Sequence, residues 1–89
     1  MNISEIIKIT TKEFNNSQKE HEIKYGDEFV LIGSGSSLDS LALVNFLTKL
    51  DKNLNTKLKK DFDVINKLFS LEKDKVTILD LKKMLDDNS

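Results

Sequence analysis

The chain is organised around the stretch LDSLALVNFLTKL, residues 38–50, which follows a loop of glycine and serine residues. Leucines recur through and beyond this stretch with the helical spacing i, i+4, i+7 and i+11, at Leu43, Leu47, Leu50 and Leu54. This spacing predicts an amphipathic helix that begins at Asp39. Asp and Ser are favoured at helix starts because their side-chain oxygens accept hydrogen bonds from unpaired backbone N–H groups. Asn53 and Asn55 mark the expected end of the helix.

Ser40 stands in the first turn of this predicted helix, where another protein can reach its hydroxyl. No histidine or lysine is placed beside it as a base, so we do not expect a catalytic serine, and we expect the chain not to be an enzyme. The alternative is a plain helix start, with Asp39 and Ser40 acting only as capping residues. The long loop before Ser40 and the apolar residues after it favour a functional site.

Three other segments carry helical signals. Asn2 and Glu5 have the spacing of a capping box, and the helix after them fades in residues 15–18. Its apolar face is predicted at Ile3, Ile6, Ile7, Thr10 and Phe14. A shorter helix is predicted over residues 61–69, with one side formed by Phe62, Ile65, Leu68 and Phe69. The last helix is predicted to start at Thr77, with Asp80 as its capping partner. It is expected to bury Ile78, Leu81 and Leu85.

A long connection, residues 19–37, separates the first two helices and contains all three glycines. Loops of this length are usually functional or held down by their own apolar residues. Residues 30–32, Val-Leu-Ile, have the composition of a short strand, but no partner strand is evident, and we interpret them as packed loop. The predicted fold class is therefore all-α, with three main helices and one short helix in a single domain spanning residues 1–89.

Composition excludes several functions. The 89-residue chain has 38% hydrophobic and 33% charged residues and a net charge of −1, so it has no overall attraction to nucleic acid. It has no cysteine, so any thiol chemistry must come from a cofactor. The N-terminus lacks the apolar segment of a signal peptide, and no stretch approaches the length of a membrane-spanning helix. We expect a cytoplasmic monomer with no metal site, no nucleic-acid partner and no membrane partner.

The stretch IKYGDEFVLIGSGSSLDSLALVNFLTKL, residues 23–50, resembles the acyl carrier protein family. The resemblance implies an acyl-carrier-protein-like helical bundle in which Ser40 accepts 4′-phosphopantetheine from coenzyme A. The donor reaction would use Mg²⁺ and a phosphopantetheinyl transferase, and Asp39 and Leu41 would take part in its recognition. The terminal thiol would then carry an acyl or aminoacyl thioester. The implied partners are an acyl- or aminoacyl-adenylating loading enzyme and a downstream acyltransferase or synthase.

The sequence departs from fatty-acid carriers in its charge. Those proteins present an acidic second helix, whereas here the positions expected to be exposed are Ala42, Asn45, Thr48, Lys49 and Lys52, with Asp51 the only acid. Residues 57–60 are basic, Lys-Leu-Lys-Lys, and Ser37 replaces a glycine that is frequent in the family. Because complementary charge sets partner choice, we expect a free-standing carrier of a specialised pathway rather than of general fatty-acid synthesis. Solvated surface charge alone is the alternative explanation of the lysines.

The sequence leaves two alternatives for where the cargo would bind. Cargo could enter a crevice between helices, lined by Leu41, Val44, Phe46, Ile65 and Leu68, although residues at helical spacing are usually only core. Large aromatic side chains, Phe46, Phe62 and Phe69, could already fill that space.

The glycines at 33 and 35 lack the context of a phosphate loop, and His21 stands in a charged loop where we expect a surface role. The alternative function is a small helical protein-interaction module without a prosthetic group.

Overall fold

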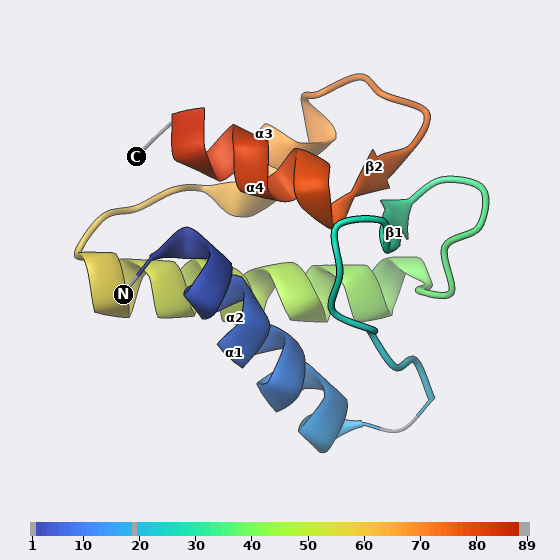
Figure 1. The fold of residues 1–89 in the computed structure, drawn as a ribbon, viewed down its shortest axis with the longest axis horizontal. Helices are drawn as coiled ribbons and strands as arrows, with labels where there is room; N and C mark the ends of the chain where they lie inside the picture. The colour runs from blue at the N-terminus through green and yellow to red at the C-terminus, as the bar shows by residue number, and fades with distance from the viewer. Residues whose placement is uncertain (1, 19, 88–89) are drawn as a thin grey trace.

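The computed structural model describes residues 2–18 and 20–87 and is mostly helical. Within these residues, four helices and two short strands follow one another as α1 (Ile3–Ser17), β1 (Val30–Ile32), α2 (Ser40–Leu58), α3 (Val64–Phe69), β2 (Val76–Thr77) and α4 (Ile78–Asp87). In Figure 1, α2 is the long horizontal helix, α1 runs obliquely across it and downward, and α3 and α4 lie above it. The strands lie near the end of α2 at which that helix begins. The predicted number and order of helices are therefore confirmed.

The small sheet corrects the interpretation of residues 30–32 as loop. β1 pairs antiparallel with β2, with Val30 opposite Thr77 and Ile32 opposite Val76. The partner strand is only two residues long and lies far along the chain, so no local sequence pattern predicts it. The all-α prediction is right for the helices and wrong for this strand pair, which joins the long connection to the start of α4.

The helix starts follow the capping signals in the sequence. The Asn2 side chain accepts a hydrogen bond from the Glu5 backbone N–H at 2.8 Å. At α4, the Asp80 carboxylate accepts from the Thr77 backbone N–H at 3.0 Å, while the Thr77 hydroxyl accepts from the Asp80 N–H at 3.3 Å. This reciprocal pair is a capping box, and it confirms the predicted start of α4. The three residues expected to be buried in α4 are also confirmed as core: Ile78, Leu81 and Leu85.

Two helix boundaries differ from the prediction. α2 continues past both asparagines to Leu58 and ends at Lys59, which has a left-handed backbone. Asn53 does not end the helix. Its side-chain amide donates to the Thr10 hydroxyl at 2.9 Å and to the Glu13 carboxylate at 2.8 Å, so it joins α2 to α1. α3 is shorter than predicted and begins at Val64, after Asp63 in a left-handed conformation.

The core is one cluster to which all four helices and both strands contribute. Phe14 of α1 and Phe46 of α2 meet edge to face, with ring centroids 5.8 Å apart, a favourable arrangement for aromatic pairs. Asn15 holds the long connection against α1, because its side-chain amide donates to the Ile23 carbonyl and accepts from the Ile23 N–H. The long connection is thus fixed at both ends, by α1 and by β2. Among the described helices, none has both the length and the apolar character to cross a membrane.

Candidate functional site

The start of α2 is built by Asp39. This residue is the N-cap, with extended backbone, and its carboxylate accepts a hydrogen bond from the Ala42 backbone N–H at 2.7 Å. Its carbonyl accepts from the Leu43 N–H at 3.0 Å, the first bond of the helix. Ser40 is therefore the first helical residue. The predicted helix start is confirmed, and Asp39 has a structural role whatever else it does.

The three residues singled out from the sequence are all on the surface. Ser40 is exposed, and within the described residues its hydroxyl has no hydrogen-bond partner. The Asp39 side chain is 62% exposed and that of Leu41 is 71% exposed. A free hydroxyl on a fixed helix start is a group that another molecule can reach and orient. Ala42, expected to be exposed, is buried, because it lies one helical turn before the buried Phe46 on the same face of α2.

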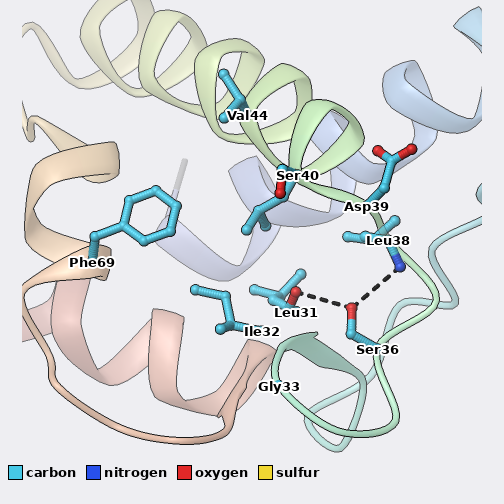
Figure 2. A pocket seen from close by; sticks show the side chains of 10 residues that line it. Leu31, Ile32, Gly33, Ser36, Leu38, Asp39, Ser40, Val44 and Phe69 are labelled. Atoms are coloured by element: carbon cyan, nitrogen blue, oxygen red, sulfur yellow. Dashed lines mark hydrogen bonds between the residues drawn. The ribbon is translucent and has the colours of Figure 1, made fainter.

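The loop before Ser40 is held from within. The Ser36 hydroxyl donates to the Leu31 carbonyl at 3.0 Å and accepts from the Leu38 backbone N–H at 3.2 Å (Figure 2). Leu38 is half-buried and packs against the core. Gly33 has φ of +107°, and any Cβ there would collide with the Asp74 carbonyl oxygen. The position of Ser40 thus depends on β1, on Ser36 and on Gly33, where the backbone conformation and the close contact leave no room for another residue.

A pocket of about 280 Å³ opens beside Ser40. Figure 2 shows Ser40 and Val44 of α2 across from the Phe69 ring of α3, with Leu31 and Ile32 of β1 below them in the view. Its complete lining is Leu31, Ile32, Gly33, Ser36, Leu38, Asp39, Ser40, Leu43, Val44 and Phe69. Of the five residues considered as a possible crevice lining, only Val44 lines this pocket. Phe46 and Leu68 belong to the core, whereas Phe69, expected to fill the interior, is 53% exposed.

His21 is the residue at this site that sequence reasoning missed. Its Nδ1 lies 2.9 Å from the Ser37 carbonyl oxygen, and its Nε2 lies 3.4 Å from the second carboxylate oxygen of Asp39. The imidazole contacts the residues on the N-terminal side of Ser40 rather than the Ser40 hydroxyl, so it is not placed as a base for that serine. The long connection carries His21 to α2, and no spacing within the sequence signals this contact.

The shifted pKa values lie away from Ser40. Burial raises the pKa of Asp51, against the lowering effect of the Val64 backbone N–H, and one Asp51 carboxylate oxygen is buried with no hydrogen-bond partner among the described residues. Asp51 was expected on the exposed face of α2, and the structure shows it half-buried toward the start of α3. The Lys73 side chain lowers the pKa of Asp80, and the Asp27 carboxylate raises the pKa of Lys82. The ion pairs of Asp80 and Lys82 stabilise the fold, whereas burial of Asp51 disfavours its charged form, and none of the three groups contacts Ser40.

The remaining polar groups give little other chemistry. In the described ranges, no three His, Asp or Glu side chains come close enough together to hold a metal ion. The exposed positions of α2 after the site include Asn45, Thr48 and Lys52, none of which is acidic. Comparisons with protein-family models, with curated proteins and with solved structures find no match to this chain. The candidate site therefore rests on its own geometry.

Proposed function

We propose that this chain is a free-standing carrier protein that bears 4′-phosphopantetheine on Ser40 and passes an acyl or aminoacyl thioester between partner enzymes in the cytoplasm. The observation that carries the proposal is the exposed, unbonded hydroxyl of Ser40 on the first turn of a 19-residue helix, beside an open pocket. The helical arrangement and the residues around Ser40 resemble those of acyl carrier proteins, and the chain itself would catalyse nothing.

The residues present fit a phosphate ester at this position. The N-terminus of a helix favours negative charge, because its first backbone N–H groups lack intrahelical acceptors and its dipole is positive there. The Asp39 side chain takes up the N–H of Ala42 and leaves those of Ser40 and Leu41 without an intrahelical partner. The Asp39 carboxylate opposes an added phosphate by its charge, but Figure 2 shows it pointing away from the pocket side of Ser40. We assign it to recognition by the transferase.

The modification step uses only the Ser40 oxygen from this chain. The Ser40 Oγ forms a bond to the phosphorus next to the pantetheine arm of coenzyme A as the pyrophosphate P–O bond breaks. The leaving group is 3′,5′-ADP, and the hydroxyl proton goes to a base of the transferase, since His21 does not contact Ser40. The transferase also supplies Mg²⁺. When bound, phosphopantetheine supplies the thiol that holds the cargo.

The surface around Ser40 supports docking to partner enzymes. Leu41, Val44 and Phe69 are exposed apolar residues on or beside the same end of the molecule, at 71%, 39% and 53% exposure. Apolar residues surrounded by polar ones are typical of interaction sites. The lack of acids at the exposed positions of α2 supports partners other than the usual fatty-acid enzymes, because charge complementarity governs which partners associate. This is the basis for proposing a specialised pathway.

The same exposed leucine also favours a second candidate, a helical interaction module without a prosthetic group. The two functions differ in one measurable property. We would incubate the purified protein with coenzyme A, Mg²⁺ and a broad-specificity phosphopantetheinyl transferase, and record the intact mass. The carrier proposal predicts a gain of one phosphopantetheinyl group by the wild type and by Ser37→Ala, and none by Ser40→Ala with an unchanged circular dichroism spectrum. No gain by the wild type, while a known carrier is modified in parallel, supports the interaction module.

A further inference from the structure

His21 connects the end of α1 to the start of α2. Its backbone is held on both sides by the Gln18 side chain, which donates to the His21 carbonyl and accepts from the His21 N–H, both at 2.8 Å. Gln18 is the C-cap of α1. The imidazole ring makes its contacts on the other side, with Ser37 and Asp39 at the N-terminus of α2. A single side chain thus spans the two helix ends beside Ser40.

Both neighbours of the imidazole ring are acceptors. The Ser37 carbonyl oxygen and the Asp39 carboxylate oxygen have no proton to give, so each contact needs an N–H on the ring. A neutral imidazole carries one N–H and one lone pair, and it satisfies one contact while turning a lone pair toward the other oxygen. An imidazolium carries two N–H groups and satisfies both. The ring can therefore donate to both oxygens only when it is protonated.

The charged groups around the ring are acidic. Glu20 and Asp39 line a pocket of about 160 Å³ together with His21, and Glu22 follows in the chain. The remaining lining residues of that pocket are uncharged: Phe14, Gln18, Leu41, Ala42 and Asn45. Among the described residues that line the pocket, His21 is therefore the only one that can carry a positive charge toward Asp39.

We infer that His21 is a positioning residue for the modification of Ser40, because its imidazolium joins the Ser37 carbonyl to the Asp39 carboxylate and fixes the backbone that leads into Ser40. This inference rests on the proposed function. It adds that the rate of modification depends on the protonation of a residue that does not touch the reacting atoms.

The test compares the wild type with His21→Gln, using the same transferase and coenzyme A at about pH 5.5 and about pH 8. Glutamine retains one donor group and has no protonation change. The pH dependence of the transferase cancels in the ratio of the two kcat/KM values. We expect the wild type to be modified about two- to fivefold faster than the variant at the lower pH, the range for a partly exposed ion pair, and equally fast at the higher pH.

A second measurement does not depend on the transferase. The ¹⁵N shifts of the His21 ring and the exchange rate of the Ala42 amide, recorded against pH, report the bridge directly. We expect both ring nitrogens to be protonated at the lower pH, with slower Ala42 exchange than in His21→Gln. A modified wild type whose rate ratio is the same at both pH values, or a ring that stays neutral, overturns the role of His21. If the wild type is modified at neither pH, the proposed function itself is wrong.

Discussion

The first turn of α2 and its later turns have similar apolar residues but different environments. Leu47, Leu50 and Leu54 are fully buried, whereas Leu41 in the first turn is 71% exposed. The later turns are enclosed by the other helices, and the first turn extends toward β1 and a pocket. Burial explains why the later leucines stabilise the fold. Leu41 is too exposed to stabilise the fold in this way. The buried leucines therefore build the core, and Leu41 is available to bind another molecule.

The largest expected effect comes from removing a buried leucine. Leu47→Ala deletes a side chain with no exposed surface, and the lost burial and the resulting cavity should lower the free energy of unfolding by about 2–5 kcal/mol. Urea denaturation followed by circular dichroism measures this change. A loss below about 1 kcal/mol would show that the later turns are not the packed part of the helix.

The next effect tests the frame that holds the first turn. Gly33→Ala adds both an unfavourable backbone at φ +107° and a collision with the Asp74 carbonyl oxygen, and we expect a loss on the order of 2–3 kcal/mol. Gly35→Ala is the matched control, because Gly35 also has positive φ but a Cβ there would meet only Val30 Cγ2, at an ordinary contact distance of 4.0 Å, and it should lose about 1 kcal/mol. Equal losses in thermal or urea unfolding would refute the close contact between Gly33 and Asp74.

A smaller effect is expected at the start of α4, on the other side of the strand pair. Asp80→Ala removes the capping box and should cost about 1 kcal/mol at neutral pH. Lys73 lowers the pKa of Asp80, so this contribution is complete above the ordinary Asp range, about pH 4, and is lost as the pH falls through the lowered folded-state value.

Urea unfolding of the wild type and Asp80→Ala across this pH range measures the difference. Asp87→Ala, at the opposite end of the same helix, controls for removal of an acidic charge and should change stability by only a few tenths of a kcal/mol. A difference between wild type and Asp80→Ala that grows as the solution becomes more acidic would contradict the assigned sign.

The smallest effect on stability is predicted for the exposed leucine. Leu41→Ala is the same substitution as Leu47→Ala in the same helix, but it should change the free energy of unfolding by less than about 0.5 kcal/mol. If Leu41 contacts the transferase, the rate of modification should fall about tenfold, as for a contributing interface residue. Thr48→Ala, also exposed on α2, should leave that rate unchanged. An unaltered rate in Leu41→Ala would remove this residue from the recognition surface.

The sequence predicted the parts of the fold that depend on neighbours in the chain. The caps at Asn2 and Thr77 and the leucine spacing of α2 are local signals, and the structure confirms them. The pairing of β1 with β2 is not local, and it was missed. Asn53 was misread because an asparagine that often ends a helix here has a buried partner on another helix, Thr10.

The candidate site was predictable to the same extent. Asp39, Ser40 and Leu41 follow from a helix start after a long loop, and the structure places all three on the surface. His21 and Phe69 come to the site from distant segments, through packing that their own spacing does not encode. Sequence patterns located the hydroxyl, and only the tertiary structure located its surroundings.

The most direct test of the carrier account is to map where the added group is attached. After reaction of the folded wild type with coenzyme A and the transferase, fragment mass spectrometry distinguishes Ser40 from the three other serines nearby, Ser34, Ser36 and Ser37. We predict one phosphopantetheinyl group per chain, on Ser40 alone, because it is the serine that α2 fixes in place with a free hydroxyl. A group on any other serine, or on none, would contradict the account.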